Sequence, residues 1–224
     1  MKKCYLSVVI ALFVSQLSAF SSFTGEPKSK NKSYWLSPKG DDGEKCFEEN
    51  THMINLGVGW GRNYARLYNA VGYSAGTTPA ISLTYEQAWP KKLGPGYLGV
   101  GAYIGYQHTY YNYNYTYLFG NNYYYNHSWN YFMIAARGAY HWDVLNSKNA
   151  EVFAGVLIGV RFQSYSYETN DPGNNDPYSF SQSSVWPVYS VFAGARWMFL
   201  KNFGLFAEVG YGISYLNGGL SIKF

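Results

Sequence analysis

The chain contains little charge. Lys, Arg, Asp and Glu together make up 13% of its 224 residues, whereas a soluble domain normally carries about 25%. Lys2 and Lys3 lie in a segment that we expect to be removed. Without them, 15 basic residues face 13 acidic ones, and the net charge falls from +4 to +2. No basic cluster is present, so the composition excludes a nucleic-acid partner, which would require a basic patch.

Cysteine is nearly absent. Cys4 lies near the N-terminus, and Cys46 is the one other cysteine. Because Cys4 falls in the predicted leader, the mature chain keeps a single thiol, and no disulfide framework holds the fold together. We interpret Cys46 as idle in a flexible region rather than as a nucleophile.

Long apolar runs are missing beyond the N-terminal leader. The longest, residues 152–160, is shorter than the ~20 residues that a membrane helix needs. Mean hydropathy is −0.25, yet aromatic residues make up 21% of the chain. Tyrosine is suited to a membrane boundary, where its ring is buried and its hydroxyl is wet. The composition therefore favours a membrane protein without membrane helices.

Residues 1–19 have the layout of a cleaved secretory signal peptide. Lys2 and Lys3 supply the positive start, residues 6–14 are apolar, and Leu17-Ser18-Ala19 offers small residues for cleavage. The alternative, an N-terminal membrane anchor, would need a longer apolar stretch. We expect export to the envelope of a Gram-negative bacterium, with the outer membrane as the final location.

The mature chain divides into two parts. Residues 20–51 are polar and irregular, and they predict a flexible N-terminal arm. Residues 52–224 alternate between apolar and polar side chains, which is typical of half-buried β-strands. We predict eight strands, and the alternation covers residues 54–60, 81–89, 98–107, 131–142, 151–163, 189–199, 205–213 and 219–224. A turn near 213–216 would instead lengthen the last strand to 216–224.

One face of each predicted strand is apolar, and the other carries nearly all the Gly, Arg and Glu. Alternation does not say which face meets water, and a soluble lipocalin-like barrel would bury the apolar face. We expect the apolar face to meet lipid, because long connections (63–78, 110–127 and 168–184) alternate with short ones, as in outer-membrane barrels. Aromatic residues also gather near the strand ends as two girdles, to which we assign Trp60, Trp89, Tyr97, Trp142, Trp197 and Phe224. The predicted fold is all-β, an eight-stranded antiparallel transmembrane up-and-down β-barrel with a flexible N-terminal arm.

The closing segment, residues 206–224, ends in Phe224 after apolar residues at alternate positions. It resembles the closing hairpin of small bacterial outer-membrane proteins, and the layout of residues 52–224 is similar to the OmpX, OmpA and OmpW type of β-barrel domain. The Gly- and Tyr-rich style resembles barrels of Bacteroidetes-like bacteria. The resemblance implies that Phe224 belongs to the signal that the barrel-assembly machinery recognises. It identifies an architecture and not an activity, because such folds host many functions.

Five charged residues fall on the predicted inner face: Glu86, Arg137, Arg161, Arg196 and Glu208. The interior of an eight-stranded barrel is narrow and filled by side chains. We therefore predict a buried ion-pair network in the lumen, since unpaired charges there are costly. The alternative is a gated or narrow pore for small solutes.

The four histidines give little sign of catalysis. His127-Ser128 is the one adjacent pair that a lipid A-modifying barrel enzyme could use, and no acid is near it in sequence. We interpret His127 as a loop residue and expect His108 and His141 to point outward near strand ends. No metal spacing and no phosphate-binding loop is found, so we expect no cofactor, no metal and no enzymatic activity.

Residues 110–127 consist mostly of Tyr and Asn. Tyr gives large contact areas at low entropic cost and Asn gives adaptable hydrogen bonds, as in binding loops. One hypothesis is adhesion to an extracellular glycan or protein; the other is that two strands extend above the membrane, with Tyr favoured by its β-propensity. We predict a non-enzymatic, structural or adhesive barrel whose partners are outer-membrane lipid, the assembly machinery and an extracellular glycan or protein. A narrow channel, a lipid-modifying enzyme and a soluble lipocalin-like barrel are the alternatives.

Overall fold

The computed structural model describes residues 45–224 except 62–67, 71, 117–119, 121, 143–146, 148 and 173–178. The predicted signal peptide and all but the last part of the predicted arm lie outside these residues. The described part belongs to one compact unit, residues 42–224. None of its segments is a helix with the length and apolar character needed to cross a membrane.

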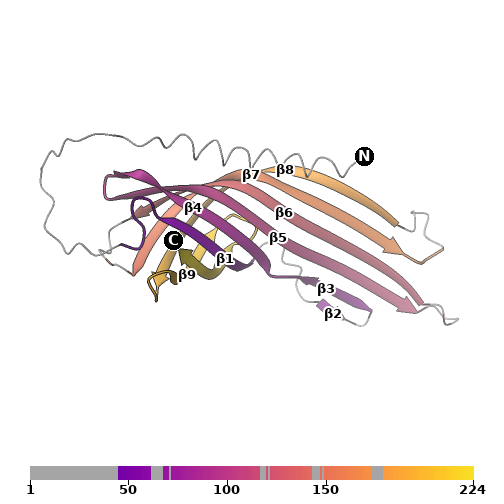
Figure 1. The fold of residues 1–224 in the computed structure, drawn as a ribbon. Coiled ribbons are helices and arrows are strands. Elements are labelled where there is room, and N and C mark those ends of the chain that lie inside the picture. Colours follow the sequence, from indigo (N-terminus) through magenta and orange to yellow (C-terminus); the bar gives the residue numbers. More distant parts are fainter. Residues whose placement is uncertain are drawn as a thin grey trace, which may run out of the picture. The chain divides into compact units, whose positions relative to one another are not determined.

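The described strands form one antiparallel sheet that closes on itself (Figure 1). Its order is β2-β3-β5-β4-β1-β10-β9-β8-β7-β6, and β5 also pairs with β6. The closed ring therefore contains eight strands, as the sequence predicted. Strands β2 and β3 are attached beside this ring. The strands are β1 (His52–Trp60), β2 (Tyr68–Ala70), β3 (Tyr73–Thr77), β4 (Ala80–Leu93), β5 (Gly96–Thr116), β6 (Asn122–Trp142), β7 (Ala150–Thr169), β8 (Ser179–Met198), β9 (Phe203–Gly210) and β10 (Leu216–Lys223).

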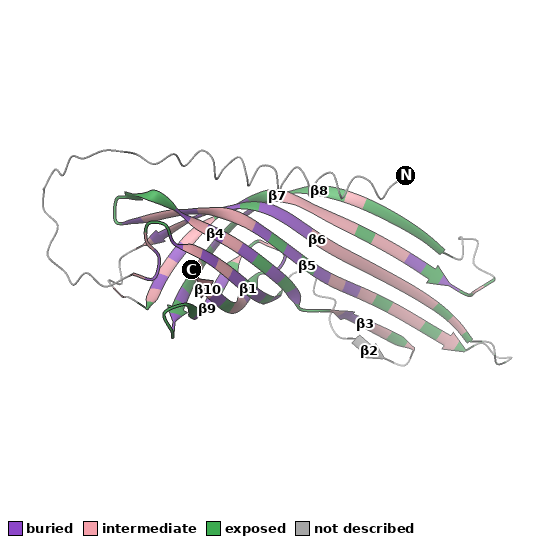
Figure 2. Cartoon of the chain, in the orientation of Figure 1, coloured by how far each residue is buried: buried purple, intermediate pink, exposed green. Residues whose placement is uncertain are grey.

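The apolar face of the barrel wall points outward. Along β7, Phe153 and Leu157 are buried, whereas Val156 and Ile158 are 48% and 57% exposed, and buried and exposed residues alternate along the other barrel strands (Figure 2). A water-soluble monomer rarely exposes a continuous apolar surface of this kind. A closed barrel leaves no unpaired sheet edge, which is what lipid requires. The predicted direction is confirmed, and the lipocalin-like alternative, which buries the apolar face, is wrong.

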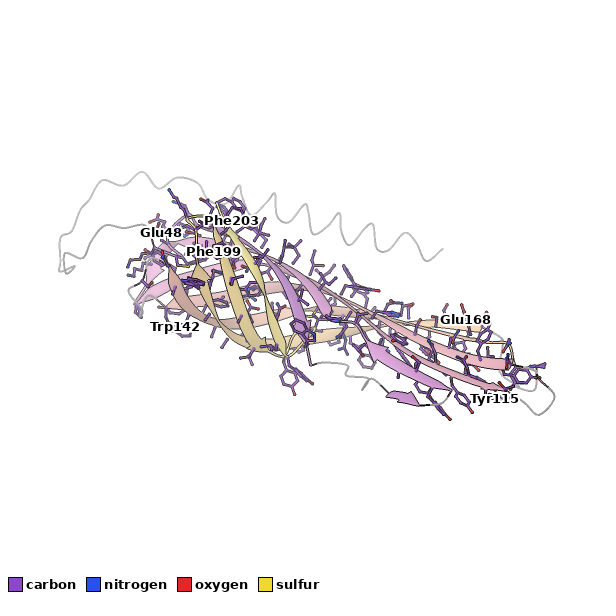
Figure 3. The ribbon with its side chains drawn as sticks, turned by 90° about the horizontal axis from the view of Figure 1, so that it is seen from below. Glu48, Tyr115, Trp142, Glu168, Phe199 and Phe203 are labelled. Carbon is purple, nitrogen blue, oxygen red and sulfur yellow. The ribbon has the colours of Figure 1, made fainter. Side chains whose placement is uncertain are left out.

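The barrel wall has unequal height. Strands β5 to β8 contain 20 or 21 residues, whereas β1, β9 and β10 contain 8 or 9. A tilted strand needs only ~9–11 residues to span a membrane. The surplus of β5–β8 forms a sheet that continues beyond the barrel, which we call the projecting sheet: residues 109–116, 122–131, 163–169 and 179–186, with β3 paired to its β5 edge. Tyr115 and Glu168 mark its far end in Figure 3, opposite Trp142 and Phe203.

The long connections predicted from sequence are wrong in detail. Residues 110–116 and 122–127 lie in β5 and β6, residues 168–169 and 179–184 lie in β7 and β8, and 63–78 contains β2 and β3. Strands β5 and β6 therefore continue through the Tyr- and Asn-rich segment, as the strand-extension interpretation expects, and the adhesive interpretation stays a prediction. Tyr and Asn alternate in residues 111–115, which is the period of a strand.

The last hairpin turns at residues 211–215, so β10 begins at Leu216, as the longer alternative predicted. Ile213 was expected in the outward apolar row, but it is only 1% exposed and joins the core with Tyr103 and Leu157. The reason is that regular alternation ends with β9 at Gly210, and the turn folds over the barrel interior.

Glycine makes room for aromatic side chains in the interior. A Cβ atom on Gly155 would lie 2.6 Å from Cζ of Phe192 and would also collide with the carbonyl oxygen of Gly138. A Cβ atom on Gly138, on the other face of its strand, would meet nothing within 4 Å. Gly155 therefore leaves the space that the ring of Phe192 occupies in the interior.

We predict that Gly155→Ala destabilises the folded barrel by about 1–3 kcal/mol, the usual cost of overpacking. Gly138→Ala is the matched control and should change the free energy of unfolding by less than about 0.5 kcal/mol. Urea titration of both variants in lipid vesicles measures the difference. Equal stability of the two variants would contradict the packing described here.

Candidate functional site

Four of the five predicted lumen charges lie together inside the barrel. Arg137 Nη2 is 2.6 Å from Glu208 Oε1, and Arg137 Nη1 is 3.3 Å from Glu208 Oε2, which makes a bidentate pair. Arg137 Nε lies 3.6 Å from Glu86 Oε2, and Arg196 Nη2 lies 3.9 Å from the same oxygen. The side chains of Glu86, Arg137 and Arg196 are fully buried. Their predicted association is a feature of the structure.

The network has two members that the sequence interpretation missed. His141 was expected to point outward, but it is 2% exposed and lies between Glu86 and Glu151. Glu151 also forms an ion pair with Arg196. The signal was present in the alternation, because His141 continues the inward row of Arg137 and Ala139 and therefore points into the barrel.

The geometry around His141 favours its charged form. Its Nε2 lies 2.9 Å from Glu86 Oε1, and its Nδ1 lies 3.3 Å from Glu151 Oε1. A neutral imidazole has one N–H, whereas the imidazolium presents an N–H at both nitrogens. With His141 charged, three cations (Arg137, Arg196 and His141) balance three carboxylates, Glu86, Glu151 and Glu208. The six groups then form a neutral cluster, which we call the lumen network.

Neutral polar groups and aromatic rings surround the lumen network. Arg196 Nε donates to Ser221 Oγ at 3.1 Å, and Ser221 Oγ donates to Asn55 Oδ1 at 2.6 Å. The Arg137 guanidinium lies 3.8 Å from the ring centroid of Phe192. This stacking adds a favourable cation–π interaction in a site that excludes water.

Arg161 is the predicted lumen charge that lies apart from this network. It points to the inner face, but nearer the projecting sheet, with its guanidinium 5.6 Å from the ring centroid of Tyr131. It has contacts of its own, so it does not stand as an isolated charge.

The short-turn end of the barrel is filled by the residues that precede β1. Cys46 and Phe47 are 3% and 5% exposed, and they pack with Met53, Ala88 and Met198. The ring of Phe47 stacks on His141 with centroids 3.7 Å apart, while Lys223 Nζ donates to the carbonyl oxygen of Lys45 at 2.7 Å. The expectation that Cys46 lies in a flexible region is wrong, because Cys46 and Phe47 together supply apolar surface that covers the lumen network.

Most of the predicted girdle residues lie on the outer surface at strand ends. Trp60, Trp89, Trp197 and Phe224 are exposed, and Trp142 is half-buried. Tyr97 is the exception, because its register opposite His141 turns it to the inner face, where it packs against the cluster of Cys46 and Phe47. The bulge in β4 between Ala88 and Lys92 lies beside it.

The interior leaves little room for a solute. A cavity of about 20 Å³ lies between Tyr103, Phe192, Glu208 and Asn217, which is space for roughly one water molecule. The lumen network and Phe47 fill the interior on the short-turn side of it.

His127 and Ser128 do not form a catalytic pair. They are adjacent in β6 and therefore point to opposite faces of the sheet. His127 Nδ1 lies 2.7 Å from the Tyr165 hydroxyl, whereas Ser128 Oγ lies 2.7 Å from Ser166 Oγ. Within the described residues, no group of three or more His, Cys, Asp or Glu side chains is placed to hold a metal ion.

A continuous aromatic surface covers the inner face of the projecting sheet. One row crosses four strands, from Tyr111 through His127 and Tyr167 to Phe180, each directly opposite the next. The ring centroids along it are 5.7, 4.9 and 5.6 Å apart. We use the name aromatic face for this row together with its neighbours on the same side, Tyr73, Tyr113, Tyr125, Trp129 and Tyr165.

Comparisons with known proteins find structural similarity only. No family model and no curated protein matches the sequence. The solved structures that resemble the chain include designed transmembrane β-barrels (13% identity, TM-score 0.37, covering 80% of this chain and 98% of that one). They also include Ail, the attachment invasion locus protein of Yersinia pestis, in complex with a heparin analogue (12%, 0.38, 79% and 96%). The N-terminal β-barrel domain of Pseudomonas aeruginosa OprF is a further one (12%, 0.35, 79% and 98%).

We predict that Arg137→Met destabilises the barrel by about 3–5 kcal/mol, because Glu208 and Glu86 then lose their nearest guanidinium in a buried site. Arg137→Met combined with Glu208→Gln should recover part of this loss, since the bidentate pair is removed as a unit. A double-mutant cycle from urea unfolding measures the coupling. If the effects of Arg137→Met and Glu208→Gln on the free energy of unfolding were strictly additive, this would contradict the ion pair.

We predict that the Cys46 thiol is unreactive in the folded protein. Burial, and to a lesser degree the negative charge of Glu151, raise the pKa of Cys46 to about 12, so at pH 8 almost no thiolate is present to react. In a Cys4→Ser background, maleimide labelling at pH 8 should be slow when the barrel is folded and fast in urea. Phe47→Ala should speed labelling of the folded form. If the folded protein that retains Phe47 were labelled rapidly, the segment before β1 would not pack as described.

Proposed function

We propose that the protein is a non-enzymatic outer-membrane β-barrel that adheres to extracellular material through its projecting sheet. The observation that carries this proposal is the division of the molecule into two parts. A filled barrel has the apolar exterior of a membrane anchor, and a rigid sheet with an aromatic face extends from one end of it.

The filled interior supports anchoring rather than transport. The lumen network is charge-balanced and buried, and its carboxylates already face cations of the chain. The cavity beside it has room for roughly one water molecule. The pore hypothesis gains no support from the described residues.

The length of the projecting sheet supports a role outside the membrane. Eight residues beyond the barrel at ~3.3 Å each extend a strand by roughly 25 Å. The far end is tied together by side chains: Tyr115 donates to Asp171 Oδ2 at 3.0 Å, and Tyr125 donates to the same oxygen. Asn170 accepts from the Tyr124 amide at 2.8 Å, and its own amide donates to the Asn122 carbonyl at 3.0 Å. A sheet fixed in this way is pre-organised for binding, which lowers the entropic cost of association.

The orientation follows from the ends of the barrel. Short turns and both ends of the barrel domain gather on one side, which is the periplasmic side in outer-membrane barrels, while the longer elements lie outside. The proposal therefore places the projecting sheet outside the cell and the Cys46–Phe47 cover in the periplasm. Outer-membrane lipid would surround the barrel wall, and the barrel-assembly machinery would recognise Phe224 during insertion.

A shortened variant tests this proposal. The register places Thr109 opposite Trp129 and Tyr165 opposite Gln182, so a two-residue turn can join each pair and remove the end of the sheet. Bacteria that display the full protein should bind to plates coated with mucin, collagen or fixed epithelial cells. Bacteria with the shortened protein should bind at least ten-fold less.

Heat-dependent gel mobility serves as the control that both forms are closed barrels in the membrane fraction. Equal retention of the two strains on all three coatings would contradict the adhesive role.

A further inference from the structure

The two faces of the projecting sheet differ in chemistry. The aromatic face occupies the inner side of the projecting sheet. The outer side has mainly small polar residues, with cross-strand pairs such as Asn112–Asn126 and Ser128–Ser166. Cross-strand aromatic pairs stabilise a sheet on either side. Stabilisation alone therefore does not explain why the rings gather on one face.

The aromatic face is directed away from the surrounding membrane. It continues the row of barrel residues that point to the interior, including Tyr103, Met133 and Leu157. The asparagine and serine face continues the outward, apolar row of the barrel wall. A ligand of the aromatic face must reach it from beyond the cell surface and not from the protein's own membrane.

Rings at the edges of the aromatic face are exposed to solvent, whereas Tyr167 within its row is 5% exposed. Tyr73, Tyr111 and Phe180 are 41%, 36% and 42% exposed, and they lie on three different strands. Trp186, on the same face nearer the barrel, is 55% exposed. The rings therefore offer a surface several strands wide rather than a single pocket.

Charge is almost absent from this face. Its three cross-strand rows contain no Lys or Arg among their described residues, and Arg161 lies below them at the level of Trp186. Among the residues that the structure describes, the carboxylate at its upper end is Asp171, which already accepts hydrogen bonds from Tyr115 and Tyr125. A sulfated or strongly acidic ligand would lose hydration here without gaining a cationic partner. The charge pattern therefore fits an uncharged ligand.

We propose that the aromatic face binds an uncharged polysaccharide presented from outside the cell. A pyranose ring has an apolar face of C–H bonds that stacks on an aromatic ring and a rim of hydroxyls that bond to tyrosine hydroxyls and to His127. Rings repeat along a strand at every second residue, ~6.8 Å apart, so successive sugars of one chain can stack on successive rows. This inference rests on the proposed adhesive function and names the ligand class for it.

Tyr111 and Tyr124 form a matched pair for the test. They are 36% and 37% exposed and lie on adjacent strands, but on opposite faces of the projecting sheet. Purified protein in vesicles is titrated with neutral hexasaccharides (cellohexaose, maltohexaose and laminarihexaose) and with heparin, with the fluorescence of Trp129 and Trp186 as the signal. We expect binding of at least one neutral hexasaccharide, weakened at least ten-fold by Tyr111→Ala and less than two-fold by Tyr124→Ala. Tyr111→Trp should retain binding, which separates lost stacking from a disturbed fold.

Three results would overturn the ligand class: no neutral hexasaccharide binds at millimolar concentration, heparin binds more tightly than all of them, or Tyr124→Ala weakens binding as much as Tyr111→Ala. If adhesion still depends on the projecting sheet while no neutral sugar binds, the adhesive function stands and this inference fails. If adhesion also survives removal of the sheet, both fail.

Discussion

Charges enclosed by a membrane-spanning barrel must be neutralised by one another, because neither lipid nor bulk water is there to solvate them. The lumen network meets this constraint with Arg137, Arg196 and His141 against three carboxylates. Its six members come from five strands, β4, β6, β7, β8 and β9, with Arg137 and His141 both on β6, so the network links distant parts of the wall. Phe47 then covers it from the short-turn end. The filled, neutral interior is what allows the outer wall to be almost entirely apolar.

The same period-two alternation has different consequences at different heights of the wall. Within the membrane it separates aliphatic side chains from the interior charges. Above the membrane no lipid is present to accept an apolar face, and the strands there carry Asn and Ser outward and Tyr, His and Trp inward. A change of side-chain type, with no change of backbone, thereby gives the upper part of the wall an aromatic inner surface. The proposed adhesive function depends on this change.

The sequence predicted the barrel well, because alternation shows directly which residues of a strand share a face and which face is apolar. It identified Glu86, Arg137, Arg196 and Glu208 as one cluster for the same reason. His141 and Tyr97 were assigned to the outer surface, although the alternation of side chains along their strands places both on the inner face. Cys46 and Phe47 could not have been placed from sequence, because their burial depends on a segment without periodicity that packs against residues far along the chain. The projecting sheet was predicted as long connections, with strand extension kept as an alternative for residues 110–127. Tyr and Asn alternate only in residues 111–115, and the run Tyr123, Tyr124, Tyr125 has no such period, so the sequence alone did not decide between the two.

Nitroxide scanning along β7 tests most directly whether the apolar row meets lipid and the charged row does not. Single cysteines from Val152 to Tyr167, with Cys4 and Cys46 replaced by serine, are spin-labelled in lipid vesicles, and collisions with oxygen and with a water-soluble nickel complex are measured. The account predicts oxygen access at Val156 and Ile158, access to neither reagent at Phe153 and Leu157, and nickel access at Ser164 and Ser166. Oxygen access at Phe153 and Leu157 with protection of Val156 and Ile158 would contradict it.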